Sequence, residues 1–510
     1  MGSLPEARRF GVRSVCIIGA GPSGLVAAKY LRAEQAFSRI QVYEQRATVG
    51  GVWNYVPHAS QTPYDSAVPQ TNPFAGADKP IWRQNSVGKV FDEDTQEEAA
   101  FMSPLYDRLE TNIPRGLMGF SDLDWPTDSQ LFPEHETVMQ YIEDYAKDIR
   151  DMISFQTQVL DVRLTKEERW SVKTLKVSQR GPSEVLEETY DAVVVANGHF
   201  NIPYIPEVAG MKEWNEAYPG RITHSKFYRK PEQYSGQKTI IVGNSASGVD
   251  IGAQIQTTCK LPMIVSSRSE SFLPDMQSAT KLDRPPIAQY MVKDRSVRFD
   301  NGSIEADIDA VLYCTGYFYS FPFLSSLQPA LVSTGEQVEH LYQHIFYQPH
   351  PTLAFPVLNQ KVIPFPLAEA QSAVIARVFS GRLSLPNEHE MRTWELEWAR
   401  QNGDGRMFHV LKFPKDADYI DMLHDWAASA DDSGTDSQSP QINGPVNGGK
   451  HLSSKRGKTP PYWSAKEYWI RERFPAMKKA FQELGEGRHA IRTLEEIGFD
   501  YDSWKARQNS

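Results

Sequence analysis

Two parts of the chain repeat the same order of apolar and polar positions. One runs from Arg13 to Glu44 and the other from Lys238 to Arg268. Each contains an apolar run rich in β-branched residues, a glycine-rich turn, an amphipathic stretch, and a second apolar run that ends at a charged residue. This order is typical of a strand, a helix and a second strand parallel to the first. The sequence therefore predicts two βαβ units.

A later apolar run follows in each part. DAVVVANG, residues 191–198, and DAVLYCTG, residues 309–316, both begin with Asp-Ala-Val and end with Gly. An apolar run that stops at glycine is typical of a buried central strand whose end lets another group approach the backbone. We therefore predict an α/β fold with two Rossmann-like dinucleotide-binding domains, the second inserted into the first.

The predicted domain boundaries follow from this insertion. Residues 1–200 and 320–427 would form the first dinucleotide-binding domain, which is discontinuous, and residues 201–319 the inserted second one. Residues 428–462 are rich in Ser, Gly, Pro and Asn, which predicts a disordered loop or linker. Residues 463–510 are predicted to be a helical segment that packs on the first domain.

Composition narrows the class of protein. The 510 residues are 40% hydrophobic and 23% charged, which is typical of a globular protein, and the net charge of −10 argues against nucleic acid or anionic lipid as a partner. No apolar run approaches the ~18 residues of a membrane span, and the N-terminus lacks the apolar core of a signal peptide. Cys16, Cys259 and Cys314 show no CxxC spacing, so we expect no disulfide framework, dithiol centre or metal site. A cytoplasmic enzyme is the expectation.

The first glycine-rich turn, GAGPSG, has the spacing of a phosphate cradle. Gly19 allows the tight turn, Gly21 lets the backbone approach a pyrophosphate, and Gly24 permits close packing of helix on strand. The N-terminus of the helix that follows supplies N–H donors and a positive dipole. The predicted cofactor-binding residues of this turn are Gly19, Ala20, Gly21, Pro22, Ser23 and Gly24.

The second turn, GNSASG, keeps two of the three glycines. Ser245 replaces the middle glycine, and its hydroxyl and that of Ser247 can donate to a phosphate. Asp250, early in the predicted helix, either complements the helix dipole or fixes the cradle. The predicted cofactor-binding residues here are Gly243, Ser245, Ser247, Gly248, Val249 and Asp250.

Opposite charges distinguish the two cradles. Glu44 stands 25 positions after Gly19, and Arg268 stands 25 positions after Gly243. A carboxylate at that strand end accepts both hydrogen bonds of a ribose diol and repels a 2′-phosphate, whereas a guanidinium binds the phosphate. The sequence therefore predicts FAD or NAD in the first cradle and NADP in the second.

Further motifs indicate which class of flavoprotein this is. The stretch YPGRITHSKFYR, residues 218–229, resembles the FxGxxxHxxx(Y/F) signature of the flavin-containing monooxygenases, class B flavoprotein monooxygenases, with Tyr218 in place of the leading Phe. Other segments that are similar to that family are GGVW at 50–53, LETNIPRGLMGF at 109–120 and CTGY at 314–317. Within the family, residues 341–386 look most like the soluble fungal or yeast-like members.

The resemblance implies an activity. In that family NADPH reduces FAD, O2 adds to the reduced flavin, and the resulting hydroperoxide passes its distal oxygen to a soft nucleophile. The expected partners are O2 and a small-molecule substrate with a nucleophilic sulfur or nitrogen. A homodimer is compatible with the sequence, which leaves the oligomeric state open.

The resemblance also implies roles for individual residues. Asn112, flanked by Thr111 and Ile113, matches the active-site Asn of the family, and its amide can donate and accept hydrogen bonds without titrating. Val52 and Trp53 match flavin contacts, and Gln371 would approach the flavin ring by analogy. His224 is expected to be a structural hydrogen-bonding residue between the two domains.

Three alternatives stay open on the sequence. Baeyer–Villiger monooxygenases carry a near-identical signature that ends in Trp followed by Pro or Asp, and this chain has Tyr228 and Arg229 there. An uncoupled NADPH oxidase on the same scaffold would release only H2O2. A dinucleotide sensor without catalytic activity would keep the two cradles and use residues 428–462 as an interaction tail.

Overall fold

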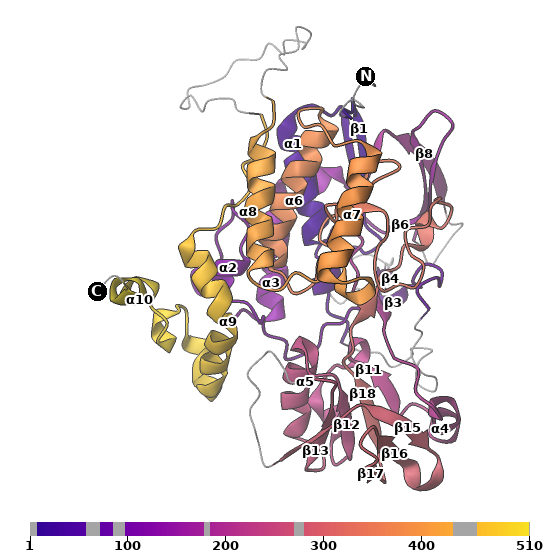
Figure 1. The fold of residues 1–510 in the computed structure, drawn as a ribbon, viewed down its shortest axis with the longest axis vertical. Coiled ribbons are helices and arrows are strands. Elements are labelled where there is room, and N and C mark those ends of the chain that lie inside the picture. The colour runs from indigo at the N-terminus through magenta and orange to yellow at the C-terminus, as the bar shows by residue number, and fades with distance from the viewer. Residues whose placement is uncertain are drawn as a thin grey trace, which may run out of the picture.

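Two sheets organise the structure, one mainly parallel with an antiparallel edge and one fully parallel, and each contains one of the predicted repeats. The computed structural model describes residues 8–57, 72–84, 97–177, 184–269, 280–431 and 456–508. Figure 1 shows the larger lobe, with α1, α6, α7 and α8, above a smaller lobe with α5 and the second sheet. The fold is α/β, as predicted.

The larger lobe is built on a seven-stranded sheet of order β20-β21-β22-β9-β1-β2-β5. Its strands are β1 (Ser14–Ile18), β2 (Arg39–Tyr43), β5 (Ile153–Ser154), β9 (Ala192–Val195), β20 (Leu341–Tyr342), β21 (Phe346–Tyr347) and β22 (Leu353–Ala354). Its helices are α1 (Pro22–Glu34), α2 (Arg115–Met118), α3 (His135–Ala146), α6 (Pro364–Phe379), α7 (Glu388–Asn402) and α8 (Lys415–Ala428). Every residue of α6 from Phe365 to Phe379 is buried, because this helix packs between α1 and α8.

The smaller lobe is built on a five-stranded sheet of order β11-β18-β12-β13-β14. Its strands are β11 (Ile222–His224), β12 (Thr239–Val242), β13 (Met263–Ser266), β14 (Lys281–Arg284) and β18 (Ala310–Tyr313), with α4 (Met211–Ala217) and α5 (Ala246–Gln256) as its helices. An antiparallel sheet formed by β15 (Ile287–Met291), β16 (Ser296–Phe299) and β17 (Ile304–Glu305) lies beside it.

Short antiparallel sheets complete the fold. They are β3 (Ile81–Gln84) with β4 (Glu97–Ala100), β6 (Thr157–Leu164) with β7 (Trp170–Lys176) and β8 (Val185–Tyr190), and β10 (Ile202–Pro203) with β19 (Tyr317–Phe318). The last pair joins the two chain crossings between the lobes, because β10 leads into the smaller lobe and β19 leads out of it.

The repeat predicted from the sequence is present at the level of individual hydrogen bonds. Strand β1 lies parallel between β2 and β9, and β12 lies parallel between β13 and β18. The Asp that opens each DAV segment holds the start of the central strand. Asp191 accepts from the Ser14 amide at 2.8 Å, and Asp309 accepts from the Lys238 amide at 3.0 Å.

The C-terminal segment is helical and lies against the larger lobe. It comprises α9 (Ala465–Glu483), the 3₁₀ turn η8 (Gly485–Ala490) and α10 (Tyr501–Gln508), and Figure 1 shows α9 beside α2. The Gly457 amide donates to the Ala33 carbonyl at the end of α1 at 3.0 Å. Most of the linker predicted at 428–462 lies outside the described residues, and the exact domain boundaries stay a prediction. Within the described residues, no helix is both long and apolar enough to cross a membrane.

Candidate active site

A cavity of about 330 Å³ opens beside the turn between β1 and α1. The predicted site residues that line it are Gly19, Gly21, Pro22, Ser23, Glu44, Val52 and Trp53. Ala20 and Gly24 belong to the same glycine-rich turn, but they are not among the described residues that line the cavity. The structure thus brings the first glycine-rich turn, the charged end of β2 and the GGVW segment to one place.

Three glycines give the first cradle its shape. Gly19 has a φ of +103°, and a Cβ there would lie 2.6 Å from the Ala196 carbonyl oxygen. A Cβ on Gly24 would lie 2.0 Å from the Gly19 carbonyl oxygen, so helix α1 can approach β1 only with glycine at this position. Gly21 faces Gly51, where a Cβ would stand 3.4 Å from the Gly51 Cα. The N-terminus of α1 therefore presents bare backbone to the cavity, which fits a pyrophosphate.

Glu44 is fixed at the far end of this cradle. Its side chain is 3% exposed, and its two oxygens accept from the backbone amides of Ala20 at 2.8 Å and Arg46 at 2.9 Å. A carboxylate has about four acceptor positions, so two remain for a ligand. Because the backbone orients this carboxylate in advance, it fits the ribose diol predicted from the sequence.

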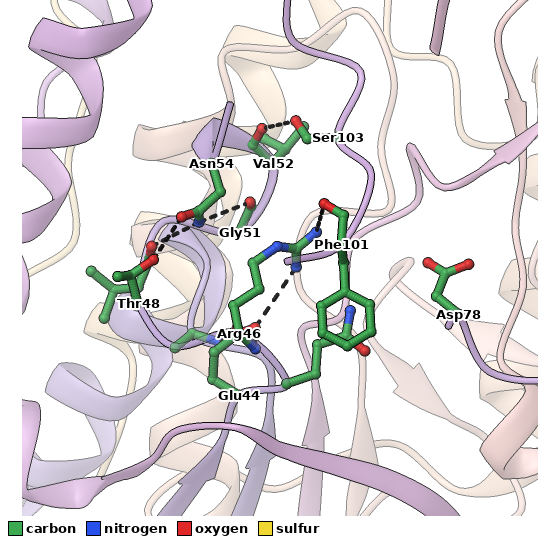
Figure 2. A network of polar contacts seen from close by, with 12 residues as sticks. Glu44, Arg46, Thr48, Gly51, Val52, Asn54, Asp78, Phe101 and Ser103 are labelled. Carbon is green, nitrogen blue, oxygen red and sulfur yellow. Dashed lines mark hydrogen bonds and ion pairs between the residues drawn. The ribbon is translucent and has the colours of Figure 1, made fainter. Parts of the chain in front are cut away.

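Loop residues near the Glu44 carboxylate also line the cavity. Figure 2 shows Arg46 between Glu44 and Phe101, with Asp78 across the open space. The Arg46 guanidinium lies 3.7 Å from Glu44 Oε1 and stacks over the Phe101 ring at 5.6 Å. Arg46 and Asp78 both line the cavity, although the sequence analysis did not single them out.

The GGVW segment forms the 3₁₀ turn η1 (Gly51–Trp53) on the cavity wall. Asn54 closes this turn by donating to the Val49 carbonyl at 2.8 Å and the Gly51 carbonyl at 3.2 Å. The Ser103 hydroxyl donates to the Val52 carbonyl at 2.5 Å, as Figure 2 shows. The segment that carries the two predicted flavin contacts is therefore tied to a loop that also lines the cavity.

The second cradle repeats the backbone of the first. Gly243 has a φ of +105°, and a Cβ there would lie 2.6 Å from the Cys314 carbonyl oxygen. A Cβ on Gly248 would lie 2.1 Å from the Gly243 carbonyl oxygen. Cys314 occupies the position in its strand that Ala196 occupies in the first repeat, so the two turns meet equivalent strand ends.

The rim of the second cradle is open. Ser245, the N-cap residue of α5, is exposed, and Arg268 is exposed just beyond the end of β13. Ser247 and Val249 lie in the first turn of α5 and are half-buried. Asp250 accepts from the Tyr106 hydroxyl and from the Gln254 amide at 3.3 Å, and burial raises its pKa. Asp250 thus contacts the larger lobe, which favours the second of its two predicted roles, fixing the cradle.

Arg406 is a second guanidinium near Arg268 that sequence reasoning missed. It donates to the Thr315 carbonyl at 3.1 Å, at the end of β18, and stacks over the Tyr204 ring at 4.0 Å. Burial lowers the pKa of Arg406, and the charge of Arg268 lowers it further. No motif marks Arg406, because the fold brings it to the second cradle from a distant part of the chain.

Asn112 lies in a turn that precedes α2. The Thr111 amide donates to the Pro133 carbonyl and its hydroxyl donates to the Ile113 carbonyl, both at 2.9 Å. Asn112 itself is half-buried. Among the described residues that line the cavity, none of Thr111, Asn112 and Ile113 occurs, so their contact with the flavin stays a prediction.

Gln371 is not among the described residues that line the cavity either, but it hydrogen-bonds to Val357, which is. It is fully buried in α6, and its Oε1 accepts from the Val357 amide at 2.6 Å. Val357 lines the cavity and has a φ of +56°, a conformation that a β-branched residue rarely adopts. Gln371 therefore holds a strained piece of the cavity wall in place.

The signature segment links the two lobes by alternating its contacts. His224 and Tyr228 face the smaller lobe. His224 Nε2 lies 3.0 Å from the Gly316 carbonyl, and the Tyr228 hydroxyl donates to Gln254 at 3.0 Å. Burial lowers the pKa of His224 to about 3, so the ring is neutral and structural. This geometry is compatible with a hydrogen-bonding role, but both hydrogen bonds of the ring, with the Gly316 carbonyl and the Lys226 amide, lie within the signature segment and the smaller lobe. The link between the domains predicted for His224 therefore stays a prediction.

Two further residues of the signature segment face the larger lobe. Lys226 lies between His224 and Tyr228, and Arg229 directly follows Tyr228. Lys226 donates to the backbone and side-chain oxygens of Asn201 at 2.6 and 2.7 Å. Arg229 is 3% exposed and donates to the carbonyls of Leu105 at 2.9 Å and Ser103 at 3.1 Å. Because Ser103 in turn holds Val52, the signature segment is joined to the cavity wall by two successive hydrogen bonds.

His199 is another residue that the sequence analysis did not select. It directly follows the glycine that ends the β9 segment, and that position was the available signal. It lines the cavity with 7% exposure, and burial lowers its pKa to about 4. Both histidines near the site are therefore neutral at physiological pH.

Known proteins resemble this chain over most of its length. The family model described as flavin-binding monooxygenase-like matches residues 81–281 and 284–433, and a model for NAD(P)-binding Rossmann-like domains matches residues 17–82. Flavin-containing monooxygenase FMO GS-OX-like 2 of Arabidopsis thaliana is 36% identical over 394 residues, which are 74% of this chain and 76% of that protein. The structure of S-allyl-L-cysteine S-oxygenase from Allium sativum has a TM-score of 0.70 and 27% identity over 98% of both chains. The structure of Tmm from Pelagibacter sp. strain HTCC7211 has a TM-score of 0.65 and 21% identity, and the match covers 92% of this chain and 90% of that one. At this identity the similarity supports only the fold.

One prediction needs correction. The relatives from Arabidopsis thaliana and Allium sativum are plant proteins, so the resemblance to fungal or yeast-like members is not borne out. That resemblance rested on residues 341–386, which form β20, β21, β22 and the buried helix α6. Buried positions are limited by packing, so their sequence is a poor guide to the source of a protein. With a family model matched across more than half of its length, the chain belongs to the flavin-binding monooxygenase-like proteins, and it is a flavoprotein oxidoreductase that uses FAD and NADPH.

Proposed function

We propose that this enzyme uses NADPH and O2 to oxygenate a soft nucleophilic sulfur or nitrogen atom of a small molecule. In the balanced reaction, substrate, O2, NADPH and one proton give the oxygenated substrate, water and NADP⁺. Bound FAD, once reduced by NADPH, supplies the activated oxygen. The residues of the chain then have to position the cofactors, shield the reacting atoms and avoid unwanted proton transfer.

Each cofactor is assigned to one cradle. We propose FAD at the first, with its pyrophosphate at the N-terminus of α1 and its adenosine ribose on Glu44. We propose NADPH at the second, with its 2′-phosphate on Arg268, which is exposed after β13. Arg406, near Arg268, adds positive charge to the same crevice.

The two histidines near the site are compatible with a nucleophilic heteroatom, although only His199 is among the described residues that line the cavity. His199 on the cavity wall and His224 in the signature segment have pKa values lowered by burial to about 4 and about 3. Neither ring donates a proton as an imidazolium at neutral pH. A thioether or amine attacks oxygen with its own lone pair and needs no such acid or base. The site therefore suits a nucleophilic heteroatom.

Asn112 would contribute a hydrogen bond that does not change with pH. Its amide donates and accepts without titrating, so it can hold the reacting oxygen or the nicotinamide ribose. The neighbouring Thr111 and Ile113 fix the turn through the hydrogen bond between them. We propose Asn112 as the residue that protects the activated oxygen from loss as H2O2.

A thioether is the first substrate to test, because the S-oxygenase from Allium sativum resembles this chain over almost its whole length. Purified enzyme would be incubated with NADPH, ¹⁸O2 and S-allyl-L-cysteine, with the all-carbon analogue as the control. We expect a sulfoxide that carries one ¹⁸O atom and NADPH consumption that rises with the thioether alone. An ester from a ketone panel would indicate Baeyer–Villiger chemistry instead, and H2O2 with every thioether and amine would reduce the activity to an NADPH oxidase.

A further inference from the structure

Two cations from the C-terminal segment hold one carboxylate two residues before Asn112. Glu110 Oε2 accepts from Lys478 Nζ of α9 at 3.1 Å, and Glu110 Oε1 accepts from Arg488 Nε of η8 at 2.9 Å. The Glu110 side chain is 12% exposed and the Lys478 side chain 9%. Charge-assisted hydrogen bonds to a largely buried carboxylate are among the stronger polar contacts in proteins. We call these three residues the Glu110 clamp.

The C-terminal segment also holds the other arm of the Asn112 turn. Before the turn, the His135 amide donates to the Leu109 carbonyl at 3.1 Å. After it, the Arg115 amide donates to the Leu131 carbonyl at 2.9 Å. The Leu131 amide in turn donates to the Ile491 carbonyl, just after η8, at 2.9 Å. The segment from α9 to Ile491 therefore contacts the turn directly at Glu110 and supports its other side through Leu131.

Lys478 is placed where all three parts of the fold meet. Its ammonium lies 4.8 Å from the ring centre of Phe132 and 5.2 Å from that of Phe481. Burial lowers the pKa of Lys478, while the charges of Glu110 and Asp250 raise it. Asp250 belongs to α5 of the second cradle. The clamp thus joins the Asn112 turn to the C-terminal segment, and its lysine lies within electrostatic range of Asp250 on the helix proposed to bind NADPH.

A metal ion is the other occupant to consider for this cluster. Glu110, Glu134 and His489 offer ligand atoms within 4.8 Å of one another. Both oxygens of Glu110, however, already accept from a lysine and an arginine. The two positive charges oppose a third cation at the same carboxylate, so the cluster is accounted for by the clamp.

We propose that Lys478 and Arg488 are positioning residues that set the Asn112 turn, so that coupling of NADPH oxidation to oxygen transfer depends on the C-terminal segment. The family model ends at residue 433, so Lys478 and Arg488 lie outside the region that it matches. The inference rests on the role proposed above for Asn112. Figure 1 shows α9, which carries Lys478, beside α2 of the larger lobe.

The test compares Lys478→Met and Arg488→Gln with the wild-type holoenzyme. We expect hydrogen exchange of peptides covering residues 109–115 to be about tenfold faster in each variant, because the turn loses a charge-assisted hydrogen bond. FAD content should be unchanged, and the H2O2 released per NADPH oxidised should rise severalfold. Lys478→Arg, which keeps the charge, should restore most of the coupling.

Lys479→Met is the matched control. Lys479 follows Lys478 on α9, is 44% exposed and pairs with Glu483 at 3.9 Å. It should behave as the wild type in both measurements. If Lys478→Met does not fold, Arg488→Gln decides the question, because the Arg488 side chain is already 25% exposed.

Asn112→Ala separates this inference from the proposed function. If Asn112→Ala releases H2O2 while the clamp variants match Lys479→Met, the clamp is overturned and the role of Asn112 stands. If Asn112→Ala leaves coupling at the wild-type value, the proposed role of Asn112 fails, and the dependence of coupling on the clamp fails with it. Faster exchange together with raised H2O2 in both clamp variants supports the inference.

Discussion

The two cradles share one backbone and differ at their rims. Each turn has a glycine with positive φ against a strand end and a second glycine against the first, at nearly identical distances. At the first cradle, Glu44 is 3% exposed and is held by two backbone amides on the wall of the cavity. At the second, Ser245 and Arg268 are exposed.

The difference separates a resident cofactor from an exchanging one. A buried acceptor that is oriented in advance favours tight binding, because little is lost in ordering it. An exposed guanidinium attracts a phosphate but is screened by solvent and salt, so its ligand leaves more readily. Under the proposed assignment of the cofactors, we expect the duplicated backbone to give two affinities that the rim residues set.

The largest expected effect comes from filling the space at the inner glycines. In Gly24→Ala and Gly248→Ala the new Cβ would lie 2.0 and 2.1 Å from a carbonyl oxygen, an overlap that costs about 3 kcal/mol. We expect Gly24→Ala to be isolated without FAD, and Gly248→Ala to keep FAD but lose reduction by NADPH.

The FAD-to-protein absorbance ratio and anaerobic reduction kinetics measure both effects. Gly252→Ala is the control, because its Cβ would make an ordinary contact of 3.5 Å with Met263. Loss of FAD from both variants alike would contradict a separation of the two cradles.

A smaller loss is expected from Arg229→Met, which removes the Arg229 hydrogen bonds between the signature segment and the larger lobe and leaves those of Lys226 in place. Several buried carbonyls, including those of Leu105 and Ser103, would lose their donor. We expect the free energy of unfolding to fall by about 3 kcal/mol. Urea denaturation of the holoenzyme followed by flavin fluorescence measures this, with exposed Lys230→Met as the control. Equal stability of the two variants would show that the segment does not brace the first cradle.

We expect the free energy of unfolding to depend on pH through Glu369, a buried carboxyl group of the larger lobe. Glu369 of α6 accepts from the Ser121 amide at 2.9 Å and hydroxyl at 2.7 Å, and burial raises its pKa from 4.5 to about 7. Because the folded protein holds this proton more tightly than the unfolded chain, stability falls as pH rises from about 4.5 to about 7.

Relative to Glu369→Gln, the wild type should lose about 2 kcal/mol of unfolding free energy across that range. Urea titrations at a series of pH values measure it, with Glu483→Gln, a 55% exposed carboxyl, as the control. Parallel pH profiles for the wild type and Glu369→Gln would contradict the assignment.

The smallest effect is expected from Arg268→Ala. An exposed guanidinium contributes about 1.4 kcal/mol to phosphate binding, so the preference for NADPH over NADH in kcat/KM should fall about tenfold. The effect should shrink in high salt. Exposed Lys260→Ala is the control. An unchanged coenzyme preference would show that Arg268 does not contact the 2′-phosphate.

The sequence was informative where function depends on short spacing. The glycines of both turns, Glu44 and Arg268 lie within single βαβ units, so their order along the chain determines their place in space. His199 follows a predicted strand end and could have been chosen by the same logic. The local pattern was therefore sufficient for the backbone of both cradles.

Contacts made by distant segments could not be predicted. Arg406 reaches Thr315, beside the second cradle, across 91 residues of chain, and Lys478 reaches Glu110 across 368. Asn112 and Gln371 were chosen by resemblance, and the structure places Gln371 one hydrogen bond behind the cavity wall, on Val357. Such contacts depend on how the lobes and the C-terminal segment assemble, which no local periodicity encodes.

The most direct test of the account is a crystal structure of the enzyme with both FAD and NADP⁺ bound. We predict the adenosine ribose of FAD on Glu44 and the 2′-phosphate of NADP⁺ on Arg268. FAD at the turn that begins with Gly243, or an NADP⁺ 2′-phosphate beside Glu44, would contradict the claim that the rim charges assign the two cofactors.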